Sequence, residues 1–418
     1  MGKLLVYLKD YKKESVLGPL FKLLEASFEL IVPLVMAAII DHGVVDGDKP
    51  YIMKMCLVLV LLAVIGLTCS ITAQYFAAKA AVGFSTGLRH ALFEHIQKLS
   101  FSEMDTVGTS TLITRMTSDI NQTQNGVNLV LRLFLRSPFI VFGAMIMAFT
   151  IDVKAALVFV VTIPLLSVVV FGIMLVSIPL YKKVQSALDK VLGITRENLT
   201  GSRVIRAFNK EDDEITDFNN SNDALTKIQL YVGKISALMN PLTYVIINGA
   251  VVVLVWTGAI RVNSGYITQG EVVALVNYMS QILVELIKLA NLIININKSI
   301  ACGNRIQAIF ELQPSITDHA VTPVAEEKAE HSGEVPEVVF SHVGLTYAGA
   351  GEESLTDIDF TVKKGETVGI IGGTGSGKSS VVNLIPRFYD ATKGSVQIEG
   401  KDVREYSLEE LRGKIGMV

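Results

Sequence analysis

Long, nearly unbroken runs of apolar residues alternate with charged segments up to about residue 300 of this 418-residue chain. A bilayer core about 30 Å thick is crossed by roughly 20 mostly apolar helical residues. Runs of this kind predict six membrane-spanning helices, at Leu17–Ile39, Ile52–Gln74, Pro138–Ile151, Ala155–Leu180, Pro241–Ile260 and Val272–Ile294. The third run is short, and Val127–Leu135 extends it on its N-terminal side.

Lysine and arginine are distributed unequally between the two sides of these predicted spans. The N-terminus and the two long connections, after spans two and four, are basic, and Arg132 and Arg136 count with them. The three other loops hold only Lys49, Lys154 and Arg261. Because basic loops stay on the cytoplasmic side, we expect both termini to be cytoplasmic in a multi-pass protein of the cell membrane.

The two basic connections have helical rather than loop character. Phe84–Ser100 has apolar residues at helical spacing, and Tyr181–Phe218 contains few helix breakers. A helix from Ala155 to about Asn209 would be on the order of 80 Å long, so much of it projects beyond the membrane. A cytoplasmic partner could contact the tips near Ser110–Asp119 and Arg203–Asn209; the alternative is a pair of solvated hairpins.

A few charged residues fall inside the predicted spans. Glu25 and Glu29 lie a turn apart in span one, and Glu285 and Lys288 lie on neighbouring faces of span six. A charge at mid-bilayer costs about 2.5–3.5 kcal/mol, so these groups should face protein or a watery cavity. Either they line a substrate path or they form a structural pair. The six histidines form no metal-ligand spacing.

After span six the pattern changes. Residues 311–336 are polar and contain three prolines, which is typical of a linker. Residues 338–347, which alternate imperfectly, then predict a strand, and TVGIIG (367–372) predicts a short buried strand. SSVVNLIPRF (379–388) follows as a predicted helix.

A phosphate-binding pattern lies between this strand and this helix. Gly372 is followed after four residues by Gly377, Lys378 and Ser379, which matches GxxxxGK[ST]. The glycines let successive backbone N–H groups point at phosphate oxygens. Lys378 should reach the β- and γ-phosphates, and the Ser379 hydroxyl should bind Mg²⁺. The predicted phosphate-site residues are Gly373, Thr374, Gly375, Ser376, Gly377, Lys378, Ser379 and Ser380.

Composition agrees with a membrane protein. Half of the residues are hydrophobic and 18% are charged, where soluble domains carry about 25% charged residues. The net charge of −3 gives no reason to expect nucleic acid as a partner. The three cysteines are scattered, which is typical of apolar helix residues.

Residues 346–418 resemble the first part of the nucleotide-binding domain of an ATP-binding cassette (ABC) exporter. Residues 88–120 and 197–214 resemble the family's two intracellular coupling loops, so the resemblance covers essentially the whole chain. It is closest to halves of bacterial heterodimeric multidrug exporters. The resemblance implies that Tyr347 stacks on the adenine of ATP; the alternative is a surface tyrosine at a strand end.

The resemblance implies an α-helical polytopic membrane domain followed by an incomplete α/β P-loop domain. We expect the membrane domain at 1–310, the linker at 311–336 and the first part of the nucleotide-binding domain at 337–418. The family's glutamine loop, LSGGQ signature, Walker B segment and switch histidine are expected beyond Val418. The catalytic residues are therefore unknown from this sequence.

The predicted function is ATP-driven export of a small amphipathic molecule by alternating access. The chain would be one half of a dimer, with a heterodimer favoured over a homodimer, and would use ATP and Mg²⁺. The alternative is a membrane-anchored ATP-binding sensor that transports nothing. The substrate itself cannot be derived from the sequence.

Overall fold

The computed structural model describes residues 2–317 and 335–418, and the chain divides into two compact units. The helix unit consists of residues 6–84 and 124–300. The sheet unit consists of residues 2–5 and 85–123 together with the described residues from 301 onwards. The first long connection therefore packs with the C-terminal sheet. Most of the predicted linker, 311–336, lies outside the described residues.

Helices account for nearly all of the chain before residue 311. In order they are η1 Gly2–Tyr11, α1 Lys12–Ala38, η2 Ile39–Val44, α2 Lys49–Lys98, α3 Phe101–Val107, α4 Thr109–Thr114, η3 Arg115–Asp119, α5 Ile120–Leu129, η4 Val130–Phe134, α6 Arg136–Ile151, α7 Val153–Ala207, α8 Glu211–Ala237, α9 Met239–Asn263 and α10 Gln269–Phe310. The later elements are β1 Val338–Leu345, β2 Leu355–Val362, α11 Lys378–Leu384, β3 Lys393–Ile398, β4 Lys401–Asp402, η5 Val403–Glu405 and α12 Leu408–Gly413.

The described residues contain six helical stretches that are long and apolar enough to cross a membrane. They are Gly2–Val44, Lys49–Lys98, Thr109–Ile151, Val153–Ala207, Glu211–Asn263 and Gln269–Phe310. This confirms the six predicted spans and the polytopic helical fold class. The single long helix predicted from Ala155 is also confirmed, since α7 has 55 residues.

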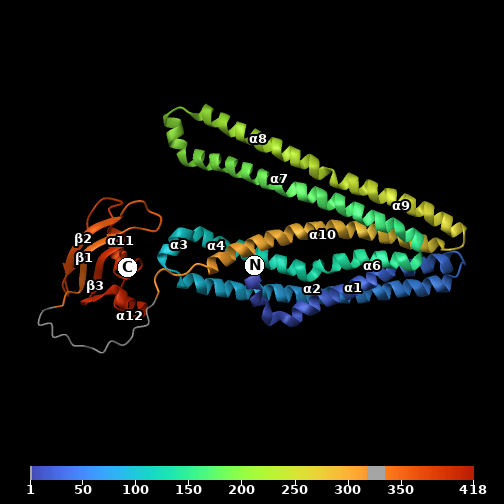
Figure 1. The fold of residues 1–418 in the computed structure, drawn as a ribbon, viewed down its shortest axis with the longest axis horizontal. Coiled ribbons are helices and arrows are strands. Elements are labelled where there is room, and N and C mark those ends of the chain that lie inside the picture. Colours follow the sequence, from blue (N-terminus) through green and yellow to red (C-terminus); the bar gives the residue numbers. More distant parts are fainter. Residues whose placement is uncertain (1, 318–334) are drawn as a thin grey trace. The chain divides into compact units, whose positions relative to one another are not determined.

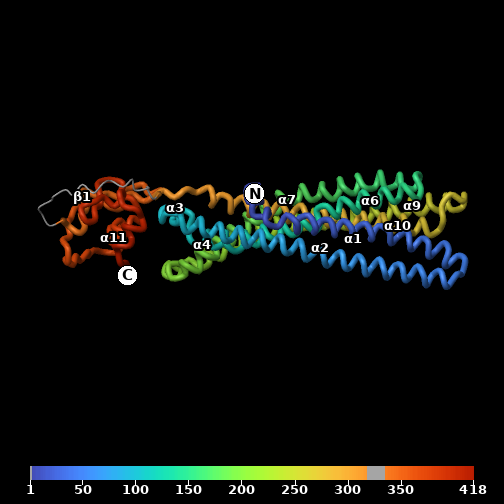
Figure 2. The backbone as a smooth tube through the Cα atoms, turned by 90° about the horizontal axis from the view of Figure 1, so that it is seen from below, coloured from blue at the N-terminus to red at the C-terminus, as the bar shows by residue number. Residues whose placement is uncertain are grey.

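The helix unit is held together by small and aliphatic side chains from several helices. α1 lies against α2, where Phe21 and Phe76 stack with their ring centroids 6.4 Å apart; Figure 2 shows the two helices side by side. Tyr278 of α10 donates a hydrogen bond to the carbonyl of Leu30 at 2.5 Å. Figure 1 shows α7 and α8 as an antiparallel pair, in agreement with their extensive contact. Their connection forms the tip of the second long hairpin.

The sheet unit contains a four-stranded antiparallel sheet in the order β2-β1-β3-β4. Phe340 of β1 faces Phe360 of β2 and Val396 of β3 in register. The first two rings stack with centroids 4.6 Å apart. α11 packs on the sheet through Val381 and Leu384, which belong to the same buried cluster as Phe340. This packing places the start of α11, and the glycine-rich loop before it, beside the sheet.

Candidate functional site

The loop from Gly372 to Gly377 leads directly into α11. Gly375 and Gly377 both have a φ of +85°, in the left-handed region that side chains disfavour. A Cβ on Gly377 would also lie 2.6 Å from the Leu355 side chain, and one on Gly372 would lie 2.6 Å from Ser376 Oγ. The loop conformation therefore favours glycine at Gly375 and Gly377, whereas a side chain at Gly372 would displace the Ser376 hydroxyl. Curled backbone of this kind forms a concave anion site, so the residues present fit a phosphate group.

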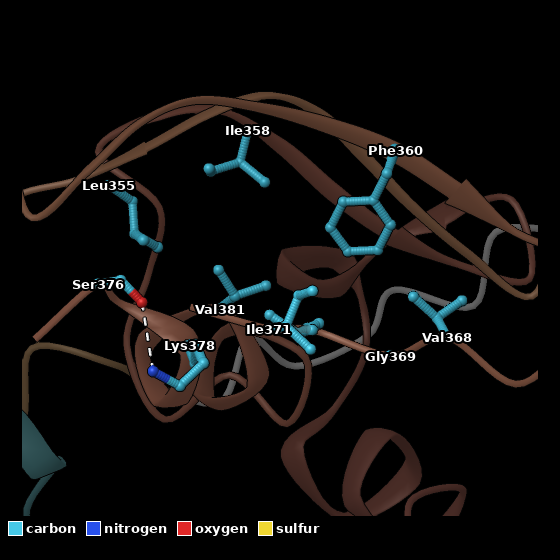
Figure 3. Close-up of a pocket in the computed structure, with 10 residues that line it drawn as sticks. Leu355, Ile358, Phe360, Val368, Gly369, Ile371, Ser376, Lys378 and Val381 are labelled. Atoms are coloured by element: carbon cyan, nitrogen blue, oxygen red, sulfur yellow. Dashed lines mark hydrogen bonds between the residues drawn. The ribbon is translucent and has the colours of Figure 1, made fainter. Parts of the chain in front are cut away.

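Lys378 is the first residue of α11 and its side chain turns back over the loop. Its ammonium donates hydrogen bonds to the carbonyls of Gly372 at 2.9 Å and Gly373 at 2.6 Å. It also reaches Ser376 Oγ at 3.3 Å, the contact drawn in Figure 3. The positive charge thus lies at the mouth of the loop. Ser379, whose hydroxyl could hold a magnesium ion, follows on the helix and is exposed.

Tyr347 lies beside this loop, although it is far from it in sequence. Its hydroxyl donates a hydrogen bond to Ser380 Oγ at 2.8 Å. Ser380 is the third residue of α11. The structure thus brings the predicted adenine residue and the predicted phosphate residues together in one place. Tyr347 is half-buried, so part of its ring remains accessible.

The prediction of a buried strand at 367–372 is wrong for this structure. These residues form no strand, and Ile371 is 96% exposed. A buried strand needs hydrogen-bonding neighbours, and no described strand pairs with this segment. Instead, Val368 and Ile371 line an open, mainly apolar cavity of about 410 Å³ whose other side is formed by Ile358 and Phe360 of β2, as Figure 3 shows.

Within the sheet unit, the helix α3 of the first long connection packs on the segment that follows α11. Phe101 contacts Phe388 with ring centroids 4.5 Å apart. Asp105 accepts a hydrogen bond from the Tyr389 hydroxyl at 2.5 Å. Both tyrosine and phenylalanine come from the segment just after α11. Burial and the neighbouring Asp105 carboxylate raise the pKa of Tyr389. The Tyr389 hydroxyl therefore stays protonated and can donate the hydrogen bond to Asp105.

The sequence interpretation missed these contact residues. It placed a tip at Ser110–Asp119, whereas the contact is made by α3, several residues earlier. Asp119 instead lies at the base of the connection, 3% exposed. It pairs with Arg115 at 2.9 Å and with Arg305 at 2.5 Å. The adjacent aromatic residues Phe388 and Tyr389, just after the helix that follows the glycine-rich loop, were the sequence feature that could have indicated the contact.

The helix unit holds a buried network of charges. Glu285 is 3% exposed and accepts hydrogen bonds from Arg136 at 2.8 Å, Ser137 at 2.8 Å and Lys288 at 2.9 Å. Arg136 also pairs with Glu29 at 2.6 Å. The sequence interpretation counted Arg136 among the cytoplasmic basic residues, but it is 8% exposed and pairs with both carboxylates.

This network bears on the two alternatives for the charges in the spans. Glu285 is fully satisfied within the chain, which favours a structural pair at that position. Glu25 pairs separately with Lys22 at 2.5 Å. The Glu29 side chain is 40% exposed, and a cavity of about 430 Å³ is lined by Glu29, Glu285 and Lys288 among others. A substrate path through Glu29 therefore stays a prediction.

Comparison with known proteins gives two matches that together span both units. Residues 15–286 match the family described as ABC transporter transmembrane region, and residues 355–418 match the family described as ABC transporter. An uncharacterized ABC transporter ATP-binding protein of Mycobacterium bovis is 33% identical, over 99% of this chain and 70% of that protein.

Two further relatives have names that state a transported molecule or process. A protein of Bacillus subtilis, provisionally named a multidrug export ATP-binding/permease protein, is 30% identical over 100% of this chain and 72% of its own length. An ATP-dependent lipid A-core flippase of Desulfotalea psychrophila is 30% identical over 79% of this chain and 56% of its own length. Similarity therefore extends over the glycine-rich loop and the six apolar helices alike.

Proposed function

The chain belongs to the ABC transporter family as a half-transporter of the exporter type, and from this premise we propose that it exports a small amphipathic molecule across the cell membrane at the expense of ATP. The observation that carries the proposal is that the glycine-rich loop and α3 of the first long connection lie in the same unit, where α3 packs on the segment just after α11. The names of the relatives, one for multidrug export and one for a lipid flippase, support an amphipathic substrate.

We assign the nucleotide site to the residues that the sequence predicted. Tyr347 stacks on the adenine, and the backbone from Gly373 to Gly377 surrounds the phosphates. Lys378 neutralises the β- and γ-phosphates, and Ser380 orients Tyr347 through the hydrogen bond between their hydroxyls. The Ser379 hydroxyl would hold Mg²⁺, which would supply positive charge to the transferred phosphoryl group.

We divide the chain into a membrane domain at 1–310, a linker at 311–336 and a nucleotide-binding segment at 337–418. Both termini are proposed to be cytoplasmic, in the cell membrane, because the basic residues gather on that side. Removing Arg136 from the count leaves this argument intact, since nine lysines and arginines lie between Lys182 and Lys234 alone.

The proposed partner is a second half-transporter, with a heterodimer favoured over a homodimer. ATP that binds the closed pair more tightly than the open pair shifts the equilibrium towards closure. The helices that continue from the membrane into the long hairpins carry that closure to the spans. We assign no general base within residues 337–418, so hydrolysis, which resets the cycle, is proposed for the assembled transporter.

The alternative is a membrane-anchored ATP sensor without transport. It would require no mechanical connection between the nucleotide site and the helices that lead into the membrane. The contact of α3 with Phe388 and Tyr389 favours the transporter. A sensor would bind ATP without ATP-dependent movement of any compound.

The variant Lys378→Ala tests the proposed site. Removing a charged donor to phosphate costs about 1.5–3 kcal/mol, so we expect ATP affinity and ATP-dependent dye efflux to fall on the order of 10- to 100-fold. Efflux is measured in vesicles that contain the full-length protein with its partner. Lys364→Ala is the matched control, because Lys364 is exposed on the same unit and lies outside the loop. Unchanged efflux in Lys378→Ala would refute the assignment.

A further inference from the structure

Tyr389 follows α11 and contacts two parts of the sheet unit that are distant in sequence. Its ring meets that of Tyr347 edge-on, with centroids 5.0 Å apart and planes at 89°. Its hydroxyl donates to the Asp105 carboxylate of α3 at 2.5 Å. Phe101, also on α3, lies 6.2 Å from the same ring. One side chain therefore touches both the proposed adenine residue and α3.

The other end of this path is fixed to the phosphate-loop helix. Tyr347 donates its hydroxyl hydrogen to Ser380 at 2.8 Å, and Ser380 lies two residues after Lys378. A continuous series of direct contacts therefore runs from Ser380 through Tyr347 and Tyr389 to Asp105. A displacement of Tyr347 must either move Tyr389 or be resisted by it.

The segment around Tyr389 is itself held firmly, which allows it to transmit a displacement. Arg387 is 3% exposed and pairs with Asp390 at 2.7 Å. Arg412 of α12 donates to the carbonyl of Pro386 at 3.3 Å, and its guanidinium lies 5.5 Å from the Phe388 ring centroid. Residues on both sides of Tyr389 are thus tied to the sheet unit, while its hydroxyl faces α3.

Phe388 and Tyr389 have different contributions to the contact with α3. Phe388 supplies apolar packing against Phe101. Tyr389 supplies a directional hydrogen bond to a carboxylate, a charge-assisted bond of the stronger kind. Replacing Tyr389 by Phe removes this bond and keeps the ring, so packing and directional connection can be separated by experiment.

We propose that Tyr389 is a positioning residue that couples nucleotide binding at Tyr347 to the docking of α3. The proposal rests on the proposed function, because it takes Tyr347 as the adenine residue. A base stacked on Tyr347 restrains that ring, the ring restrains Tyr389, and the Tyr389 hydroxyl stays directed at Asp105. By thermodynamic reciprocity, docked α3 raises the affinity for nucleotide by the same factor by which nucleotide favours docked α3.

The test is a double-mutant cycle with Tyr389→Phe and Asp105→Ala in the full-length transporter, assembled in lipid nanodiscs. ATP affinity is measured with a fluorescent ATP analogue. The protection of the backbone amides of residues 101–107 against hydrogen exchange is measured with and without ATP. We expect each single variant to lower ATP affinity about three- to tenfold and to remove the ATP-dependent part of the protection. The double variant should be no worse than either single variant, because both remove the same link.

Tyr406→Phe is the matched control. Tyr406 is a buried tyrosine of the same unit, and its hydroxyl donates to the Ile398 carbonyl at 2.9 Å. The Tyr406→Phe substitution likewise removes one tyrosine hydroxyl hydrogen bond within the sheet unit, but away from α3. A purely structural role for Tyr389 predicts that Tyr389→Phe behaves like Tyr406→Phe, with lower stability and an unchanged response of residues 101–107 to ATP.

The outcomes separate this inference from the proposed function. Additive effects in the double variant, or an intact ATP response of α3 in Tyr389→Phe, would overturn the coupling role while ATP binding by the wild type upholds the nucleotide site. Failure of the wild type to bind ATP, with Lys378→Ala indistinguishable from it, would instead overturn the proposed function.

Discussion

The two long hairpins that leave the membrane spans end in different ways. The first hairpin, residues 85–123, ends in α3, which packs through Phe101 and Asp105 on aromatic residues of its own chain. The second hairpin is formed by α7 and α8, and its tip exposes apolar side chains. These are Leu199 at 75%, Val204 at 60%, Phe208 at 73% and Ile215 at 57% exposure.

The two hairpins are also anchored differently. The base of the first contains Asp119, a buried carboxylate between two arginines. In the second, the hydrogen bond between Tyr181 of α7 and Ser236 of α8, 3.3 Å long, lies on the exposed surface. Apolar side chains left in water lose the free energy that burial would provide. We therefore expect the apolar side chains of the first tip to be buried by the same chain, and those of the second tip to be buried by the second half-transporter.

The largest effect is expected from breaking the buried anchor of the first hairpin with Asp119→Ala. Removing one partner of a buried ion pair costs about 3–5 kcal/mol. Because Arg305 is half-exposed and water can solvate its charge, we expect the loss in unfolding free energy to lie at the lower end of that range. Unfolding can be followed with a thiol-reactive dye, because Cys69 and Cys302 are free and buried.

Asp189→Ala is the control for the second hairpin. Asp189 accepts a hydrogen bond from Gln185 at 2.9 Å on the exposed surface of α7. We expect its unfolding free energy to stay within about 0.5 kcal/mol of the wild type. An equal loss of unfolding free energy in Asp119→Ala and Asp189→Ala would contradict the proposed difference between the two hairpins.

A smaller effect is expected from the matched pair Phe101→Ala and Phe208→Ala. An aromatic pair contributes about 0.5–1.5 kcal/mol beyond its buried area, so Phe101→Ala should weaken docking of α3 in the chain alone. Phe208→Ala should leave the stability of the unpaired chain unchanged and weaken its association with the second half-transporter. Hydrogen exchange of residues 101–107 and crosslinking of the pair measure the two effects.

The comparison would be broken by a reversed result in this pair. If Phe208→Ala destabilised the unpaired chain as much as Phe101→Ala, the second tip would have its packing partner within the same chain. If neither variant altered crosslinking of the assembled pair, the second tip would not contact the partner.

The smallest effect is expected from a surface charge pair on the sheet, His342 with Asp357. Its contribution to stability can be compared with that of the buried ion pairs of Asp119. A hydrogen bond to Asp357 at 2.7 Å, with the charges of Asp357 and Asp359, raises the pKa of His342. Stability from a raised pKa is fully present below the unfolded pKa of about 6.5 and is lost as pH rises through the folded pKa.

The wild type should therefore exceed His342→Gln in stability slightly at about pH 5.5, and the difference should disappear by about pH 8.5. Unfolding midpoints of the two proteins across this range provide the measurement. A difference that grew with pH would have the wrong sign for a stabilised imidazolium. A difference as large as that of Asp119→Ala would remove the distinction between surface and buried pairs.

The sequence alone predicted the six spans, the long helix α7 and the glycine-rich loop before α11. Each depends on local information: the length of an apolar run, the small number of helix breakers over residues 181–207, and glycines at positions of positive φ in Gly375 and Gly377. Such features depend on neighbouring residues in the chain, so periodicity and spacing are sufficient to find them.

The tertiary structure alone decided which distant residues meet. TVGIIG has the composition of a buried strand, yet it forms none here, because a strand needs partners that its own sequence does not encode. Arg136 looked like a cytoplasmic basic residue until packing paired it with Glu285 and Glu29. Likewise, no spacing rule connects Asp105 to Tyr389, 284 residues later. Contacts of this kind depend on how whole helices and sheets pack, and that energy is shared among many residues rather than recorded at either one.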